Sequence, residues 1–157
     1  MARLLILAHA PLASAFKAVA THTFPELAQR VQALDVQADQ SPEAVEALAR
    51  ALIQAVWPDD KPDAPRETLV LTDVFGATPC NVAQRLADDR NQVRVLAGLN
   101  VPMLWRALNY AALPLDDLLS RSMIGGAQGV LPIASTRPQN QAFPPRAYDP
   151  DQHHHQQ

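Results

Sequence analysis

Short apolar segments alternate along this chain with segments of helical periodicity. Residues 4–8 and 68–73 are mainly apolar, whereas residues 31–36 alternate apolar and polar positions. Strands that alternate with helices are typical of a parallel α/β sheet. A mainly apolar strand is buried on both faces, and an alternating strand keeps one face toward water. We therefore expect a parallel sheet with residues 31–36 nearer to an edge, and a fourth strand over residues 92–97.

The clearest helix begins at Pro42, because Ser41 is a suitable N-cap and proline is favoured at the first helical position. The apolar side chains that follow recur at helical spacing and predict one buried stripe, made of Val45, Leu48, Leu52 and Val56. A proline-rich loop is expected over residues 58–66. Further helices are expected over residues 13–30, 79–89, 101–110 and 115–123.

The ends of the later elements carry their own signals. Thr78 is the expected N-cap of the helix over residues 79–89, which starts with a proline. Gly125 and Gly126 are expected to end the last helix, and residues 129–133 predict a final strand. Because Pro132 has no backbone donor, that strand belongs at an edge of the sheet.

The composition is that of a folded domain. The chain has 157 residues, of which 48% are hydrophobic and 18% charged, so global disorder is excluded. Residues 1–135 are expected to form one domain, and residues 136–157, rich in Pro and Gln, a disordered tail. His153, His154 and His155 near the end are expected to be solvated and not to form a metal site.

Charge and cysteine content narrow the class of function. The formal net charge of −3 argues against nucleic acid as a partner. A single cysteine cannot form an internal disulfide framework, which favours a reducing compartment. His9 and Pro11 interrupt the apolar N-terminal segment, and no uncharged apolar run reaches the roughly 18 residues that a membrane span needs. We expect a cytoplasmic protein without stable membrane insertion.

Two residues follow strands at the place where open parallel sheets bind ligands. His9 comes directly after residues 4–8, and Asp73 closes the strand at residues 68–73. In a sheet of order 2-1-3-4 these two strands are neighbours at the point where the order reverses. His9 and Asp73 then face each other, and the turn of Gly76, Ala77 and Thr78 leads into a helix beside them.

This combination predicts a reactive histidine. A carboxylate that accepts a hydrogen bond from one imidazole nitrogen fixes the tautomer and leaves the other nitrogen free to attack. A helix start attracts anions, and phosphate above all, so the residues indicate phosphoryl transfer through phosphohistidine. The same residues also have an ordinary structural explanation, since a histidine after a strand is usually incidental and Asp before Gly is a common turn former.

Residues 71–83 resemble the strand-three region of the mannose-family IIA components of the bacterial phosphoenolpyruvate:sugar phosphotransferase system. In that family an Asp, a Gly-Gly or Gly-Ala pair, Ser/Thr-Pro and Asn follow one another, as Asp73, Gly76-Ala77, Thr78-Pro79 and Asn81 do here. Residues 97–104 resemble a second motif of the family, and His9 stands where its phosphorylated histidine does. The similarity extends over about residues 1–134.

The resemblance implies both a fold and a role. The fold is a doubly wound, mostly parallel sheet of order 2-1-3-4 with an antiparallel edge strand and helices on both faces, in a homodimer that often exchanges its last strand. His9 would accept a phosphoryl group from the phosphocarrier HPr and pass it to a IIB protein for sugar uptake. Asp73 would orient His9, and the turn from Gly76 to Thr78 would bind the phosphoryl oxygens.

Two features depart from the family pattern. Family members commonly have Gly or another small residue on each side of the histidine, in a form like Gly-Thr-His-Gly. Here Ala8, Ala10 and Pro11 flank His9, and Pro11 lacks a backbone amide N–H. Many members also continue through an Ala/Pro-rich linker into a IIB domain, whereas this sequence has a Pro/Gln-rich tail in that place. The IIB partner is therefore expected to be a separate protein. A regulatory role, in which another protein senses the phosphorylation of His9, therefore stays open.

Two other classes of function remain as alternatives. Cys80 in the first turn of a helix could form a nucleophilic pair with His9. The space between His9, Asp73 and the helix start after Thr78 could instead bind a phosphorylated metabolite without covalent chemistry. No metal or organic cofactor is expected in the folded region. Met103 and Leu104 are expected to offer an apolar docking surface for HPr.

Overall fold

Four parallel strands form the sheet, in the order β2-β1-β3-β4. The structure is a computed structural model that describes residues 1–58, 60, 65–88 and 92–133. The central strands are β1 (Arg3–His9) and β3 (Thr68–Thr72), and the outer ones are β2 (Val31–Val36) and β4 (Val93–Ala97). The predicted order and the edge position of residues 31–36 are both confirmed.

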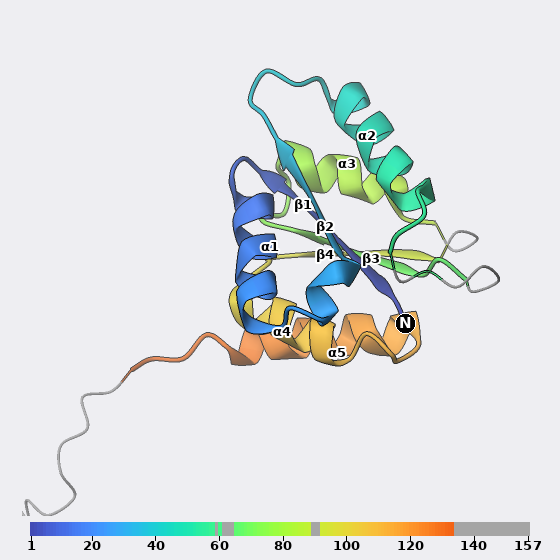
Figure 1. Cartoon of the computed structure of the whole chain (residues 1–157). Helices are drawn as coiled ribbons and strands as arrows, with labels where there is room; N and C mark the ends of the chain where they lie inside the picture. Colours follow the sequence, from blue (N-terminus) through green and yellow to red (C-terminus); the bar gives the residue numbers. More distant parts are fainter. Residues whose placement is uncertain (59, 61–64, 89–91, 134–157) are drawn as a thin grey trace, which may run out of the picture.

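Helices cover both faces of this sheet (Figure 1). On one face lie α1 (Leu12–Thr23), α4 (Val101–Asn109) and α5 (Leu115–Gln128). On the other lie α2 (Pro42–Gln54) and α3 (Thr78–Leu86). A short 3-10 helix, η1 (Leu27–Arg30), leads into β2. The fold is thus the doubly wound arrangement that the alternation of strands and helices predicts.

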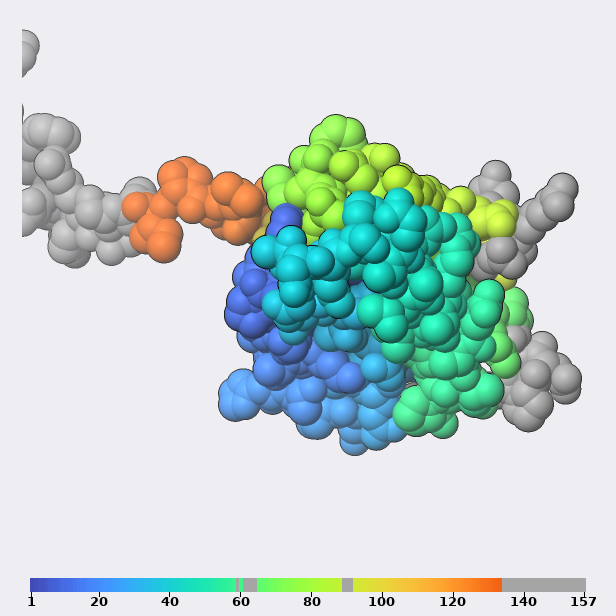
Figure 2. All heavy atoms as spheres, turned by 90° about the horizontal axis from the view of Figure 1, so that it is seen from above, coloured from blue at the N-terminus to red at the C-terminus, as the bar shows by residue number. Residues whose placement is uncertain are grey.

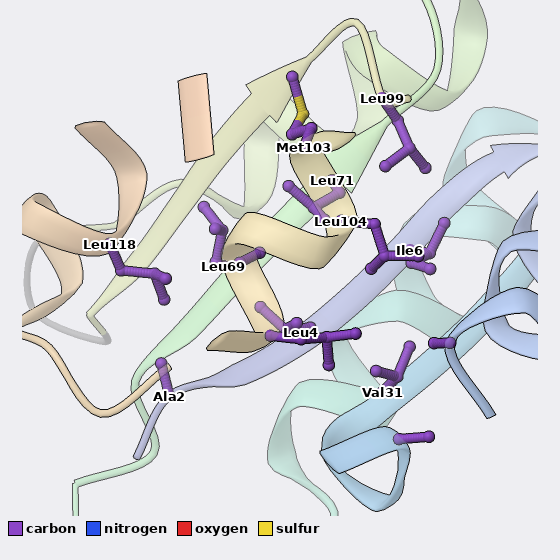
Figure 3. Packing of buried hydrophobic residues seen from close by; sticks show 14 of the residues in the cluster. Ala2, Leu4, Ile6, Val31, Leu69, Leu71, Leu99, Met103, Leu104 and Leu118 are labelled. Atoms are coloured by element: carbon purple, nitrogen blue, oxygen red, sulfur yellow. The ribbon is translucent and has the colours of Figure 1, made fainter. Parts of the chain in front are cut away.

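The apolar side chains of the central strands divide between two cores. Leu4 and Ile6 of β1 pack on the α4–α5 side, together with Leu69 and Leu71 of β3 and with Leu104 (Figure 3). The intervening side chains of β1 and β3 pack toward α2 and α3, as Leu5, Leu7 and Val70. Because side chains alternate across a strand, a strand buried on both faces is apolar at consecutive positions, as residues 4–8 and 69–71 are.

The first helix is shorter than the helical pattern of residues 13–30 predicts. It ends at Thr23, and Phe24 leaves the helical conformation with φ −136° and ψ 66°. Phe24 precedes Pro25, and the ring of a proline disfavours helical geometry in the residue before it. Residues 27–30 then form η1 as a separate element.

The second helix begins as predicted, and its buried stripe was predicted correctly only in part: Val45 is buried and Leu52 packs, partly buried, against the core. The Ser41 side chain accepts a hydrogen bond from the Ala44 N–H at 3.2 Å, so Ser41 is the N-cap. Leu48 and Val56, expected to be buried, are 45% and 75% exposed. The buried residues of the helix are Val45 and Ala49, with Leu52 and Ile53 partly buried beside them, so the stripe passes through Ala49 in place of Leu48, and α2 ends at Gln54, before Val56.

Two predicted helix ends also differ from the structure. The N-cap of α3 is Ala77, and Thr78 is already its first helical residue. The last helix continues through Gly125 and Gly126 to Gln128. A Cβ atom on Gly125 would lie 2.8 Å from Cγ of Arg106, so this glycine allows α5 to approach α4 closely and does not end the helix.

The expected edge strand over residues 129–133 is not formed within the single chain. These residues belong to no strand of the described part, and Val130, Leu131 and Ile133 are exposed. The segment projects from the body of the molecule, at the orange end of the coloured chain in Figure 2. The tail at 136–157, with the boundary of the expected domain, and most of the loop at 58–66 lie outside the described residues.

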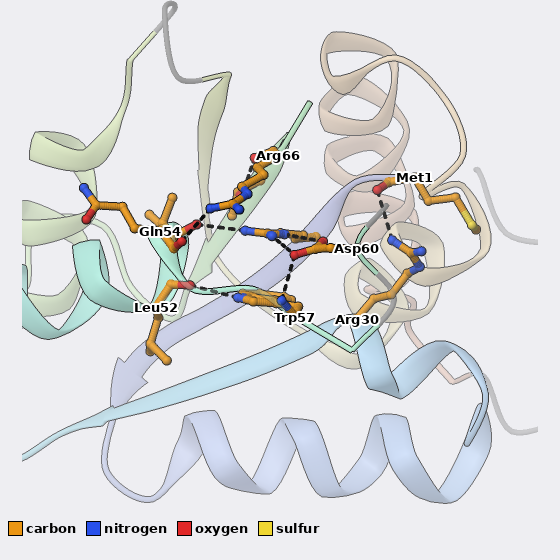
Figure 4. Close-up of polar contacts among 10 residues, drawn as sticks. Met1, Arg30, Leu52, Gln54, Trp57, Asp60 and Arg66 are labelled. Atoms are coloured by element: carbon orange, nitrogen blue, oxygen red, sulfur yellow. Dashed lines mark hydrogen bonds and ion pairs between the residues drawn. The ribbon is translucent and has the colours of Figure 1, made fainter. Parts of the chain in front are cut away.

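A buried arginine joins the first strand to the segment after α2. Arg3 is 1% exposed, and its Nε donates to Asp60 Oδ1 at 2.9 Å while its Nη1 donates to the Ile53 carbonyl at 2.8 Å. The Asp60 carboxylate also accepts the Trp57 N–H at 2.7 Å (Figure 4). Burial, and then the nearby charge of Arg66, lower the pKa of Arg3 to about 10.

Within the described residues, no helix combines the length and apolar character needed to cross a membrane.

Candidate functional site

The parallel sheet brings His9 and Asp73 together. His9 is the last residue of β1, and Asp73 directly follows β3, the neighbouring strand, in which Thr72 is level with Leu7. Asp73 Oδ2 lies 2.6 Å from His9 Nδ1 and accepts the His9 backbone N–H at 3.1 Å. The predicted proximity of these two side chains is therefore confirmed.

Asp73 is held as a charged acceptor. Its other oxygen, Oδ1, accepts the Val74 N–H at 2.9 Å. Burial raises the pKa of Asp73, but the hydrogen bonds donated by the His9 ring, the His9 N–H and the Val74 N–H outweigh burial, so its pKa is below the ordinary value. An ionised carboxylate can only accept hydrogen bonds, so it requires the proton of the neutral imidazole to be on Nδ1.

The His9 ring combines a fixed side with an accessible side. The His9 side chain is 48% exposed, whereas the Asp73 side chain is only 11% exposed. With Nδ1 bound to Asp73, the lone pair of Nε2 is available to a reaction partner. The pair can thus supply a nucleophilic nitrogen whose developing positive charge the buried carboxylate stabilises.

The turn after Asp73 leads to a helix start without an acidic residue. Gly76 has φ +85°, a conformation that favours glycine, and Ala77 then precedes the first turn of α3. No acidic residue lies in that turn and no side chain caps it. Since the first amides of a helix have no intrahelical acceptor, this end of α3 is suited to an anion.

Apolar side chains flank the pair at positions that the sequence analysis did not select. Phe75 is 76% exposed, and Val74 and Leu12 are also exposed. Met103 and Leu104, expected on the surface for docking, are buried in the core, so that prediction was wrong. The helical pattern alone did not reveal that Met103 and Leu104 lie on the side of α4 that faces the sheet. For Phe75, its position in the turn after Asp73 was a signal that its side chain is exposed.

The other candidate groups are less suited to chemistry. Cys80 lies in the first turn of α3, as expected, but it is 1% exposed, which closes its thiol to a substrate. Trp105 packs edge-on against Phe24, with ring centroids 6.3 Å apart. Among the described residues, no three His, Cys, Asp or Glu side chains gather as a metal site. A groove of about 600 Å³ lies away from His9, between α4 and α5.

Comparison with known proteins agrees with this architecture. Residues 3–121 match the family described as "PTS system fructose IIA component". The fold and the match together define a IIA-type protein of a phosphotransferase system. This chain belongs to that family.

Individual relatives give the same result. The mannose-specific EIIAB component of Escherichia coli (strain K12) is 31% identical over an alignment of 94 residues, and the match covers 55% of this chain and 29% of that protein. This chain thus spans less than a third of the length of that relative. The mannose/sorbose-specific IIA subunit from Enterococcus faecalis superposes with a TM-score of 0.72 at 27% identity, over 86% of this chain and 96% of the other. The phosphotransferase system component EIIA from Streptococcus agalactiae gives 0.70 at 27%, over 84% and 97%.

Proposed function

We propose that this protein is a phosphoryl carrier that accepts a phosphoryl group on His9. The single observation that carries the proposal is the 2.6 Å contact between Asp73 Oδ2 and His9 Nδ1 on a half-exposed ring. The family match over residues 3–121 supports it, because members are components of a phosphotransferase system. We assign attack to Nε2 of His9 and orientation of the ring to Asp73.

The transfer step is a displacement at phosphorus. The Nε2 lone pair forms a bond to the phosphorus atom, and the bond from phosphorus to the donor histidine breaks, with its electron pair returning to the donor ring. The His9 ring becomes a cation while its Nδ1 proton stays bound to Asp73, so the carboxylate stabilises the charge. The step is reversible, which a carrier requires.

We assign the transferred oxygens to the turn formed by Gly76, Ala77 and Thr78. The start of α3 follows Asp73 closely in the sequence and has neither a side-chain cap nor an acidic residue in its first turn. Its amides, and the hydroxyl of Thr78, offer donors to the negative oxygens. A metal ion is not part of the proposal, since the donors of this helix start supply the charge stabilisation.

The partners in this proposal are proteins. HPr is the donor, and a IIB protein is the acceptor for sugar uptake. The His9 ring is half-exposed, and Phe75, two residues after Asp73, is exposed too, so this part of the surface suits contact with another protein's histidine. We keep a cytoplasmic location, which rests on the single cysteine, as part of the proposal.

We also propose a homodimer. In the described part of the sheet, β4 pairs with β3 on one side, and on its other side only Val93 is paired, through a single antiparallel bridge with Asp88, so the rest of that side is an open edge. Residues 129–133 follow α5 with exposed Val130, Leu131 and Ile133. An open edge and an unpaired apolar segment are the two halves of a strand pairing between copies of the chain.

The test is phosphorylation by purified components. The full chain is incubated with labelled phosphoenolpyruvate, enzyme I and HPr, and the product is examined for acid-labile, base-stable phosphate. We expect stoichiometric label on the wild type and on His22→Gln, the matched control in α1, and none on His9→Gln. Absence of label on the wild type, while a known IIA protein is labelled in parallel, would contradict the proposal.

The same reaction separates two alternatives to the transport role, a phosphometabolite-binding module and a regulatory protein. A phosphometabolite-binding module would remain unlabelled but would bind the metabolite. A regulatory protein would be labelled, but its phosphoryl group would not pass to any IIB protein. Label on His9 that is recovered on a IIB protein supports the transport role.

A further inference from the structure

A second carboxylate, that of Asp35, binds the start of α1, the helix that follows His9 after two residues. Asp35 is on β2, level with Ala8 of β1. Its Oδ1 accepts the Ser14 N–H at 3.1 Å, and its Oδ2 accepts the Ser14 hydroxyl at 2.5 Å. The Ala10 N–H donates to the Val36 carbonyl at 3.0 Å, so the connection between β1 and α1 is tied to β2 at two points.

Asp35 and Asp73 bind the two ends of the connection between β1 and α1 in the same manner. Asp73 follows Thr72, which is level with Leu7, so the two aspartates lie on either side of Ala8. Each accepts one backbone N–H and one side-chain group of a single residue, His9 for Asp73 and Ser14 for Asp35. The short β1–α1 connection is therefore fixed from both neighbouring strands.

Of the two helix starts near His9, only that of α3 is without a carboxylate. Two helices, α1 and α3, begin at the carboxyl end of the sheet beside β1 and β3. Ser14 is the third residue of α1, and its amide is already bound to Asp35, which also places a negative charge there. The start of α3 has no acidic side chain. The charge of Asp35 thus offsets the attraction of an anion to the start of α1, and the start of α3 attracts it more strongly.

We propose that Asp35 is a positioning residue for phosphoryl transfer at His9. Asp35 acts through Ser14, because its hydrogen bonds to Ser14 fix the start of α1 and thereby the connection that follows His9. It also leaves the start of α3 as the one that receives the phosphoryl oxygens. The inference rests on the proposed function and adds to it a residue that does not touch the reacting atoms.

The test combines a rate with a spectroscopic readout on the full chain. Single-turnover phosphorylation by phospho-HPr is measured for the wild type, Asp35→Asn and Ser14→Ala. The matched control is Asp39→Asn, which removes the same charge from an exposed position four residues along the chain. Backbone amide shifts before and after phosphorylation are recorded for each protein, and amide spectra confirm that each is folded.

We expect phosphorylation of the wild type to shift the Thr78 and Cys80 amides and to leave the Ser14 amide nearly unchanged. Asp35→Asn should transfer about tenfold more slowly, since misplacement of a reacting group by a fraction of an ångström costs this much. The Ser14 amide should now respond to phosphorylation. Ser14→Ala, which keeps the backbone contact to Asp35, should show a smaller loss in rate, and it serves if Asp35→Asn does not fold. Asp39→Asn should match the wild type.

Two results would overturn the inference while the proposed function stands. One is a Ser14 amide that shifts as much as that of Thr78 in the phosphorylated wild type. The other is a folded Asp35→Asn, or Ser14→Ala in its place, that accepts the phosphoryl group at the wild-type rate. A wild-type protein that accepts no phosphoryl group refutes the proposed function itself, and this inference with it.

Discussion

At the scale of single residues, one imidazole and its buried acceptor determine what the site can do. The Asp73 carboxylate accepts hydrogen bonds from the His9 ring, the His9 amide and the Val74 amide. Three donors to one carboxylate favour its charged form. This arrangement both fixes the orientation of the ring and makes the charge of Asp73 a contribution to the stability of the fold.

The lowered pKa of Asp73 predicts how stability depends on pH. Because its pKa in the folded protein is below the ordinary 3.8, the unfolded chain binds this proton more readily. The stabilisation is therefore complete above the ordinary pKa and is lost as the pH falls through the folded value. In urea unfolding, we expect the wild type to exceed Asp73→Asn in free energy of unfolding at pH 6 by more than at pH 3. A difference that stays constant or grows toward pH 3 would contradict this assignment.

The contact between His9 and Asp73 was predictable from the sequence because topology alone brings the two residues together. In an open parallel sheet, the residues after neighbouring strands meet at one end, so the order 2-1-3-4 was sufficient to pair His9 with Asp73. The partner of Ser14 was not predictable in this way, since Asp35 lies within a strand and gives no motif. Met103 and Leu104 were misplaced because a short apolar helix does not reveal which side faces the core.

At the scale of secondary-structure elements, glycines in the last helix serve packing between α4 and α5. Gly125 and Gly126 are buried within α5, and the helix continues past them. Glycine is unfavourable within a helix by roughly 1 kcal/mol, so the sequence pattern alone favours an ending there. The close approach of Arg106 and Met103, which depends on how the helices cross, leaves no room for a side chain at these two positions.

We expect Gly125→Ala to destabilise the protein although alanine favours helices. The new Cβ would lie 2.8 Å from Cγ and 2.9 Å from Cβ of Arg106, so α4 and α5 must separate. Such overpacking costs about 1–3 kcal/mol of the free energy of unfolding, measured by urea denaturation. The control, Gln128→Ala on the exposed part of the same helix, should stay within about 0.5 kcal/mol of the wild type. Equal or higher stability of Gly125→Ala would show that the helix contact is looser than described.

At the scale of the whole molecule, the described part of the sheet ends at β4 with an open edge, and the chain leaves α5 as an exposed apolar segment. The short apolar segment of residues 129–133 predicted a strand, but no strand forms there within one chain. A segment that needs a second copy as its pairing partner carries strand character in its sequence without being a strand alone. The pattern and the structure are therefore compatible if the protein is a dimer.

The proposed dimer predicts a specific sensitivity to charge. A variant with Val130, Leu131 and Ile133 all changed to Asp should be monomeric by light scattering at concentrations where the wild type is dimeric, because three buried charges oppose strand pairing. The control is Val56→Asp, a change at a similarly exposed position beyond α2, which should leave the dimer intact. A monomeric wild type, or a triple variant that remains dimeric, would exclude pairing through this segment.

The central claim is that the nitrogen left free by Asp73 carries the phosphoryl group. The most direct measurement is a long-range ¹H–¹⁵N correlation spectrum of the labelled protein after phosphorylation by phospho-HPr, which distinguishes the two ring nitrogens of each histidine. The account predicts phosphorus on Nε2 of His9, with Nδ1 still protonated against Asp73. Phosphorus on Nδ1 of His9, or on any residue other than His9, would contradict it.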